Sequence, residues 1–467
     1  MGPEPYGAPG SKELMGQSAL ANRFDTACGF AGRLAHARYA IPVLLAAGLA
    51  IRSLAVAKRG IESQIPSEMY DVALVFARRG EIADAFVPGS GLTAHVSPLP
   101  PVIAGMVYRF TGNGGLLSEV CLTLWSLAVI FTGFLLLYRA FSASGMGRTW
   151  GMAALALLLL VPPHWFHEAV SFRTWEGGLA TLFFAAGLFI LARCEQHGGF
   201  PRALLIGMAA IIGLAFLSSP IVGLALIGCS AVFYLRRRSL PKAAGVAVLL
   251  GCAALAAITP WALRNEAALG HPVLLRSNFG LVLASAYHDG AYEARTGAQR
   301  MVEFPAYLEK INPYSSKAIT RDMMRRGGEV AYNQQLKEQA VEWIANNPSK
   351  AMALAVRYAG DFLFTPPYTW AFFRKTDTPA MYVQAYISAA MTSAGLLGLL
   401  ICLIWKERLA IYGLIYIGSA TALYALSQPT PRYHYIIHPL LVFLALRGAE
   451  LWWKRRKEKA MRTNGAG

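Results

Sequence analysis

Two carboxylates near the start of the chain combine a residue type and a spacing that can do chemistry. Glu68 and Asp71 lie three residues apart in SEMYDVALVFARRG, a stretch whose apolar residues recur with a helical period. This spacing puts both carboxylates on one face of a short helix, about one turn apart. Carboxylates held in this way suit general-base or charge-stabilising work. An ordinary solvated helix face is the simpler alternative.

A second group of candidate residues lies in HWFHE, residues 164–168. His164 and His167 are three residues apart and Glu168 is adjacent, a spacing that can hold a metal ion from one helical turn. The order is not the HExxH pattern of zinc proteases. His and Trp residues are also common where membrane spans end. These three residues are therefore weak metal candidates, and a divalent metal is the one cofactor that the sequence suggests without requiring it.

The composition indicates a membrane protein. Of the 467 residues, 55% are hydrophobic and 15% are charged, which leaves too few polar residues to cover a soluble surface. The formal charge is +17, but the basic residues lie in short clusters at the ends of apolar runs, where they meet anionic lipids. We therefore expect membrane lipids as partners and no nucleic acid. The six cysteines form no close CxxC pair, so they indicate neither disulfides nor a zinc knuckle.

Ten apolar runs of about 15 to 25 residues are long enough to cross a bilayer. They cover residues 39–57, 117–141, 149–163, 176–193, 203–218, 220–235, 243–262, 381–405, 408–426 and 434–451. Because cytoplasmic loops carry more Lys and Arg, the basic loops between these runs favour a cytoplasmic N-terminus. The prediction is an all-α polytopic membrane protein with both termini in the cytoplasm. The short runs at 149–163 and 203–218 are candidates for broken or re-entrant spans.

This assignment divides the chain into five segments. They are a cytoplasmic N-terminal segment (1–38), spans one to seven with a first outer loop at 58–116 (39–263), an outer segment (264–380), spans eight to ten (381–453) and a basic cytoplasmic tail (454–467). In the first outer loop, PLPPVIAGMVYRF predicts a second, interfacial helix. In the outer segment we expect a helix near 322–346 and another at 349–364, stopped by a proline pair.

The order of these pieces carries a resemblance to a known family. The motifs are SEMYDVALVFARRG and GLTAHVSPLPP in the first outer loop, TPWALRNEAALGHPVLLRSNFGL after the seventh span, and RYHYIIHPLL at the last span. Together they resemble bacterial membrane glycosyltransferases of the GT-C superfamily, in the family 39-like branch with protein O-mannosyltransferases and the lipid A aminoarabinose transferase. The resemblance implies transfer of a sugar from a polyprenyl-phosphate carrier to an envelope lipid, glycan or protein, on the outer face of the bacterial inner membrane.

The resemblance also implies roles for residues in the first outer loop. Glu68 matches the acidic position of the family, where the carboxylate would take the proton of the acceptor hydroxyl, and Asp71 is its neighbour. Which of the two acids is the base stays open. His95 lies near a position where relatives carry Lys before paired prolines, so it would contact the donor phosphate. A histidine that only caps the loop is nearly as good an explanation.

Arginines at the ends of spans are the candidates for binding the donor phosphate. Arg264 and Arg276 follow the seventh span and Arg432 precedes the tenth, and the planar guanidinium can donate two hydrogen bonds to one phosphate. Asn265 and Asn278 lie beside the first two arginines as candidate substrate contacts. The alternative for all three arginines is that they only anchor the membrane interface.

Two other kinds of function compete with an enzyme. A transporter or flippase for lipid-linked substrates also needs about ten spans, but it commonly places ionisable residues at the midplane of the membrane. A non-catalytic scaffold would not need both the acid of the first loop and the arginine-rich turn. The acids and motifs of this chain lie at the ends of the spans, which favours the enzyme.

Overall fold

The computed structural model describes residues 38–61, 66–112, 114–372, 379–427 and 429–464. Every regular element in these residues is a helix, and the only β-type pairing is one isolated bridge between Ala83 and Leu92. The prediction of an all-α membrane protein is therefore confirmed. The predicted N-terminal segment 1–38 lies outside the described residues except for residue 38.

Ten membrane spans is too high a count. Within the described residues, five helices are long and apolar enough to cross a membrane, or up to six if a bent pair counts as one span. The five are α2 (Ala40–Arg59), α5 (Leu116–Ala143), α8 (Gly177–His197), α11 (Leu240–Leu269) and α19 (Pro379–Ile404). The other apolar runs form the shorter helices α6 (Arg148–Leu160), α9 (Arg202–Phe216), α10 (Pro220–Leu235), α20 (Arg408–Tyr424) and the start of α22 (His438–Asn464).

The predicted span at 149–163 is broken. Helix α6 ends at Leu160, and the chain turns by 75° into α7 (Trp165–Ala169) and the 3-10 helix η1 (Ser171–Arg173). Pro162 and Pro163 explain the break, because a proline has no N–H to continue a helix and its ring clashes with the preceding turn. The polar HWFHE stretch therefore follows the bend, with His164 as the N-cap of α7 and the other four residues in its first turn.

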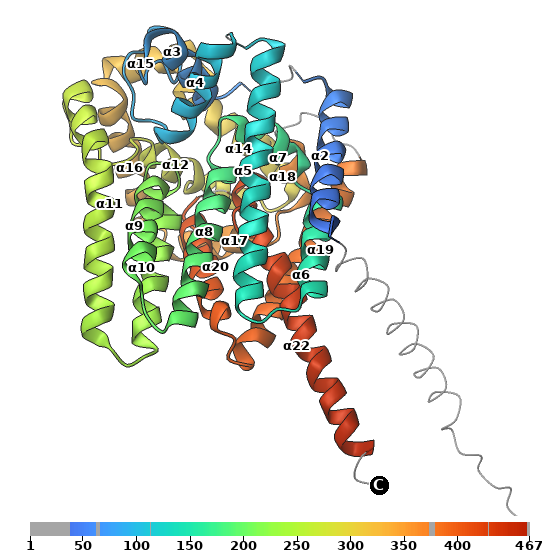
Figure 1. Ribbon diagram of the computed structural model, residues 1–467. Helices are drawn as coiled ribbons and strands as arrows, with labels where there is room; N and C mark the ends of the chain where they lie inside the picture. Colours follow the sequence, from blue (N-terminus) through green and yellow to red (C-terminus); the bar gives the residue numbers. More distant parts are fainter. Residues whose placement is uncertain (1–37, 62–65, 113, 373–378, 428, 465–467) are drawn as a thin grey trace, which may run out of the picture.

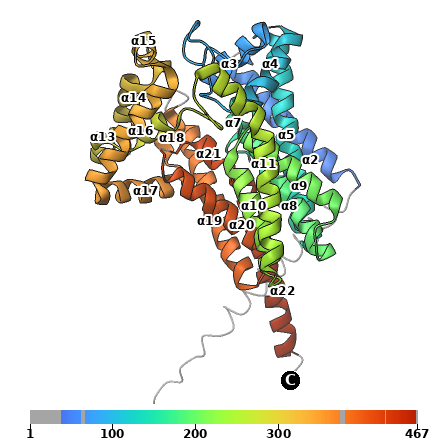
Figure 2. The same ribbon diagram turned by 90° about the vertical axis from the view of Figure 1, so that its left-hand side faces the viewer.

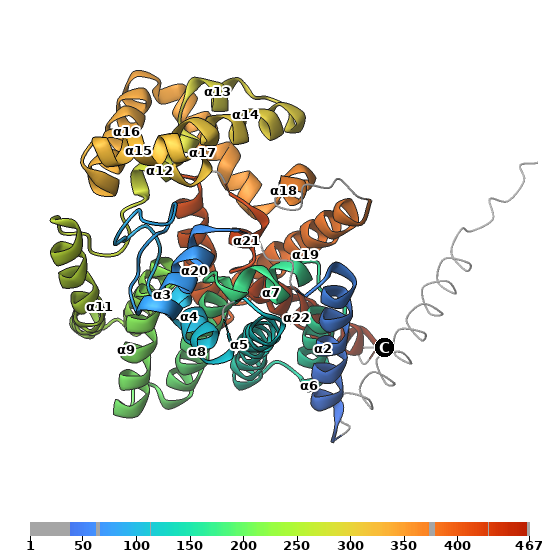
Figure 3. The same ribbon diagram turned by 90° about the horizontal axis from the view of Figure 1, so that it is seen from above.

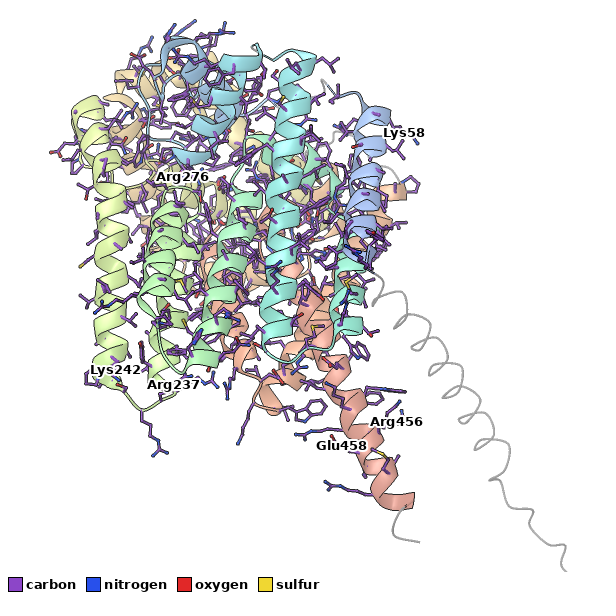
Figure 4. All side chains as sticks on the ribbon, viewed as in Figure 1. Lys58, Arg237, Lys242, Arg276, Arg456 and Glu458 are labelled. Carbon is purple, nitrogen blue, oxygen red and sulfur yellow. The ribbon has the colours of Figure 1, made fainter. Side chains whose placement is uncertain are left out.

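The helices of the first outer loop cover one end of the helix bundle, as Figure 1 shows. They are α3 (Glu68–Arg79) and α4 (Leu99–Thr111), which confirms both helices predicted in this loop. Ser67 caps α3 by accepting a hydrogen bond from the N–H of Tyr70, and Gly80 ends it in the left-handed conformation (φ 73°). We call this end of the molecule the α3 end. Lys58 and Arg276 lie toward it, whereas Arg237, Lys242 and Arg456 lie toward the opposite end (Figure 4).

The second long segment between apolar helices folds into a group of short helices at one side of the α3 end (Figures 2 and 3). They are α12 (Phe279–Ala286), α13 (Asp289–Glu293), α14 (Gly297–Ile311), α15 (Lys317–Arg325), α16 (Gly328–Asn346), α17 (Pro348–Leu363) and α18 (Pro367–Phe372), with the 3-10 helix η2 (Pro313–Ser315). The predicted helix ends at 346 and near 364 are confirmed. A left-handed Gly327 (φ 97°) separates α15 from α16 inside the predicted 322–346 helix.

The first outer loop and these short helices share one hydrophobic core. Met69 and Val72 from α3 and Val96 from the following loop are buried in the same cluster as Leu281 and Leu354. Burial of apolar side chains from both segments stabilises their association. The two polar segments that interrupt the apolar pattern therefore form one layer.

A buried ion pair fixes the break between α6 and α7. Arg52, in the middle of α2, donates from Nε to Glu168 at 2.7 Å, and both side chains are almost fully buried. Its other nitrogens donate to the carbonyls of Leu158 and Leu159, at 2.9 and 2.8 Å. These two carbonyls belong to the last turn of α6, where a helix leaves its acceptors without partners. Arg52 therefore satisfies the end of α6 and holds α7 beside it.

Replacing Arg52 by Met should destabilise the protein by about 3–5 kcal/mol, because it leaves a buried carboxylate without its cation and strips two carbonyls of their donors. The measurement is denaturant or thermal unfolding of the protein in detergent, followed by Trp fluorescence. Lys58→Met is the matched control, since Lys58 is an exposed cation on the same helix. Equal stability of the two variants would contradict this role of Arg52.

Candidate active site

Glu68 and Asp71 both lie in the first turn of α3, as predicted, but their surroundings differ. Asp71 is hydrogen-bonded to the side chain of Tyr314 in η2. Burial raises the pKa of Asp71, the hydrogen bond with Tyr314 opposes this, and the charge of Glu68 raises it further. The hydrogen bond with Tyr314 ties Asp71 to the short helices, whereas Glu68 lies beside His95.

His95 lies beside Glu68, with 4.0 Å between His95 Nε2 and Glu68 Oε1. The histidine is 4% exposed, and its ring packs edge-on against Phe86. Burial, helped by the positive charge of Arg276, lowers the pKa of His95 to about 3. His95 is therefore neutral at physiological pH, and it can offer a hydrogen bond but no charge. Its Nδ1 has no hydrogen-bond partner among the residues that the structure describes.

Arg276 approaches the same place from the loop between α11 and α12. Its Nη1 lies 3.4 Å from Oε1 of Glu176, which is a long contact for a charge-assisted hydrogen bond. Arg276 Nε and Glu176 Oε2 are buried and have no hydrogen-bond partner in the described part of the chain. Both groups therefore keep hydrogen-bonding capacity for another molecule.

Arg432 enters from α21 (Pro431–His434). Its guanidinium lies over the ring of Trp175, 3.7 Å from the ring centroid, and donates to the hydroxyl of Tyr433 at 3.2 Å. A guanidinium that stacks on a ring by one face carries its N–H donors at its edge, in the plane of the group. The carboxylates of Glu176 and Glu68 are also near enough to act on the charge of Arg432.

These residues form one group, which we call the charge cluster: Glu68, His95, Trp175, Glu176, Arg276 and Arg432. They come from five segments that are far apart in the sequence. A small pocket adjoins the cluster at Trp175 and is lined by Tyr70, Tyr108, Glu119, Val170, Ser171, Arg173, Thr174 and Trp175. A second small pocket shares Arg173 and Trp175 and is also lined by side chains of α4, α5 and α8.

Arg264 and Asn265 lie outside the charge cluster. Arg264 donates to the carbonyls of Thr93 and Ile82, at 2.7 and 2.6 Å, and Asn265 is fully buried and donates to the carbonyl of Val273. From the other side, Glu329 accepts hydrogen bonds from the hydroxyl of Thr93 and the N–H of Ala94. Arg264 and Glu329 therefore clamp the loop that carries His95. The guanidinium of Arg264, which we expected to bind a phosphate, donates to two backbone carbonyls of this loop.

Asn278 is the residue before α12, where its side chain makes no capping hydrogen bond. It is half-buried and two residues from Arg276. Its place in the sequence beside Arg276 keeps it near the charge cluster.

The three residues considered as metal ligands in HWFHE are not held together. His167 Nδ1 lies 3.1 Å from the hydroxyl of Ser171, and Glu168 is taken by Arg52 and by the hydroxyl of Tyr435. His164 lies near two other histidines, His434 at the end of α21 and His438 at the start of α22. The three residues do lie on one helical turn, since the N–H of Glu168 donates to the carbonyl of His164 at 3.0 Å, but each side chain has different neighbours.

Sequence reasoning missed several residues of this region. Trp175 precedes α8 with no pattern that marks it, and Glu119 of α5, which pairs with Arg173 at 2.8 Å, lies in an apolar run. The one usable signal was in RYHYIIHP, where His434 and His438 are four residues apart and thus on one face of a helix.

Comparisons with known proteins add little. Neither known protein families nor curated protein sequences give a match to the chain. Among solved structures, the archaeal oligosaccharyltransferase AglB from Archaeoglobus fulgidus, in complex with an inhibitory peptide and a dolichol-phosphate, is similar over 92% of this chain with 12% identity and a TM-score of 0.49. This chain spans about half of that protein, since the match covers 52% of it. A TM-score below 0.5 is too low to establish a shared fold.

Arg264→Lys should destabilise the protein by about 1.5–3 kcal/mol, because one ammonium cannot reach both carbonyls that the guanidinium fork holds. The measurement is unfolding of the protein in detergent. Arg276→Lys is the control, since Arg276 loses only a long contact and should stay near wild-type stability. If Arg276→Lys were the more destabilised of the two, the clamp would be assigned to the wrong arginine.

Proposed function

We propose that this protein is a membrane glycosyltransferase that moves a hexosyl or pentosyl group from a polyprenyl-phosphate carrier to an envelope acceptor. The observation that carries the proposal is the charge cluster. It puts a first-loop carboxylate and two arginines together at the end of the apolar helices, beside a pocket lined by residues of α4, α5 and α8. The motifs that resemble the GT-C superfamily supply most members of this group.

Arg276 and Arg432 would bind the phosphate of the donor. The phosphate that leaves during transfer gains negative charge, and guanidinium groups stabilise that charge most effectively where water is scarce. Arg276 can turn from Glu176 to a phosphate at low cost, because their contact is long and leaves hydrogen-bonding groups without partners. His95, which is neutral, would add a hydrogen bond without adding charge.

Glu68 would act as the general base. As the acceptor hydroxyl attacks the anomeric carbon, Glu68 takes the hydroxyl proton, the bond from that carbon to the phosphate oxygen breaks, and polyprenyl phosphate leaves. Glu68 suits this role better than Asp71, because the side chain of Asp71 is engaged by Tyr314. The ring of Trp175, already under Arg432, offers an apolar surface for the face of the sugar.

The apolar pocket between α4, α5 and α8 is the proposed entrance for the polyprenyl chain. Ile103, Val129, Phe172 and Leu179 line it, and it meets the charge cluster at Trp175. A lipid tail there would leave its phosphate at the arginines. We further propose that the α3 end faces the periplasm or exterior of a bacterial inner membrane, since Arg237, Lys242 and Arg456 lie at the other end (Figure 4).

Glu68→Gln should keep the protein folded and abolish most glycosyl transfer, by about 10²–10⁴-fold, because glutamine keeps the shape and cannot accept the proton. Asp71→Asn should do less. The measurement is transfer from a synthetic polyprenyl-phosphate sugar to envelope extract by the purified protein in detergent, titrated against donor.

Asp361→Asn is the folding control for this assay, because it changes a partly buried carboxylate of α17 that pairs with Arg300 and lies outside the charge cluster. Full activity of Glu68→Gln would remove Glu68 from the reaction. If the wild-type protein transferred sugar from none of a panel of such donors but moved them across vesicle membranes, the transporter would replace the enzyme as the function.

The proposed orientation predicts which positions an impermeant thiol reagent can reach. In a background without the six native cysteines, Leu92→Cys and Ala298→Cys at the α3 end should react in intact cells, because both positions are exposed. Lys242→Cys should react only after lysis. Labelling of Lys242→Cys alone in intact cells would invert the orientation and put the charge cluster in the cytoplasm.

A further inference from the structure

Three histidines meet in the interior, outside the charge cluster. His164 precedes α7, His434 ends α21 and His438 begins α22, and one ligand nitrogen from each lies within 4.8 Å of the others. All three side chains are buried, with exposures of 0 to 2%. We call them the histidine trio. Segments about 270 residues apart in the chain thus bring three imidazoles to one point.

The hydrogen bonds of His434 fix which of its nitrogens keeps a lone pair. Its Nδ1 lies 2.9 Å from the carbonyl of Phe362, and a carbonyl can only accept, so Nδ1 carries the proton. Nε2 therefore keeps its lone pair, which here accepts from the hydroxyl of Thr392 at 3.2 Å. An imidazole that donates one N–H to a backbone carbonyl and keeps a lone pair on its other nitrogen has the arrangement usual for a metal ligand.

His438 provides an independent observation. It is 2% exposed, and neither of its ring nitrogens has a hydrogen-bond partner among the described residues. A neutral imidazole has one donor and one acceptor, and burying both without partners costs free energy. Bonding to a metal would satisfy the acceptor nitrogen. His438 and His434 are four residues apart along the chain, a spacing that puts both on the same side of a helical turn.

Aromatic packing is the alternative explanation for the trio. The ring of His164 lies 4.8 Å from the ring of Trp370 and 5.5 Å from that of Tyr435, so its faces are well packed. Such packing stabilises ring faces and edges, but it gives the nitrogens of His438 no partner. Packing therefore does not explain why three polar rings meet where apolar ones would cost less.

We propose that the histidine trio binds a divalent transition metal of the zinc class. Imidazole nitrogen suits Zn²⁺, Co²⁺, Ni²⁺ and Cu²⁺, whereas Mg²⁺ and Ca²⁺ need oxygen ligands. The carboxylate of Glu168 is committed to Arg52 and Tyr435, so it does not join the trio. Around Zn²⁺ the nitrogens would approach to about 3.4 Å of one another, as tetrahedral bonds of about 2.1 Å require. Water would take the fourth position.

The metal would connect the bend after α6 with the end of α21 and the start of α22. Arg432 is two residues from His434, so the trio would help to place that arginine in the charge cluster. The site rests on the three side chains alone, and it stands whether or not the protein is a glycosyltransferase.

The test is the metal content of the full-length protein, purified in detergent without chelators and then incubated with Zn²⁺ and desalted. Elemental analysis should find about one ion per chain in the wild-type protein and less than about a tenth of that in His438→Gln, since two imidazoles do not make a closed site. His167→Gln is the matched control, because His167 is a buried histidine of the same bend that is outside the trio. It should bind as the wild type does.

A measurement on the wild-type protein covers the case in which His438→Gln does not fold. X-ray absorption of the zinc-loaded protein should give imidazole scattering from three ligands at about 2.0 Å. The proposal is overturned if the wild-type protein retains no zinc, if folded His438→Gln retains as much as the wild type, or if the absorption spectrum shows fewer than three imidazoles.

Discussion

The buried pair of Arg52 and Glu168 is the interaction on which the rest of the arrangement depends. A bend of 75° in the middle of an apolar run exposes backbone carbonyls where no water can reach them, and such groups are costly unless they find donors. Arg52 supplies the donors from a neighbouring helix and pairs with Glu168 at the same time. Because Arg52 and Glu168 fix the bend, the chain after it places Trp175 and Glu176 at the α3 end. The same bend places His164 beside His434 and His438.

A second constraint acts on the loop between α3 and α4. This loop must hold a neutral, buried histidine next to a carboxylate, and the loop has almost no regular structure of its own. Arg264 and Glu329 supply what it lacks, since each makes two hydrogen bonds to residues 82–94. The layer of short helices therefore does more than cover the bundle: α16 carries one half of the clamp, and η2 carries the tyrosine that holds Asp71.

The sequence predicted local features well and contacts between distant segments poorly. Helices α3, α4 and α17 could be predicted because caps, prolines and apolar periods are local signals. The role of Arg264 could not be predicted, because Arg264 and Arg276 are the same type of residue and both follow the same apolar run. Only the packing of the first loop shows that one meets backbone carbonyls and the other meets Glu176. The span count failed for a related reason: hydropathy does not reveal a bend, and short apolar helices read like spans.

The geometry of the ion pairs separates those that stabilise the fold from those that are free to act. Arg52–Glu168 and Arg173–Glu119 are short, at 2.7 and 2.8 Å, and each carboxylate also accepts from a tyrosine. In the charge cluster the corresponding distances are 3.4 Å for Arg276–Glu176 and 4.0 Å for His95–Glu68. A charge whose interactions are complete gains nothing from a ligand, whereas a charge in a long contact can exchange it for a better one. The same chain thus uses arginine and glutamate in two ways, and the lengths of the contacts tell them apart where residue type does not.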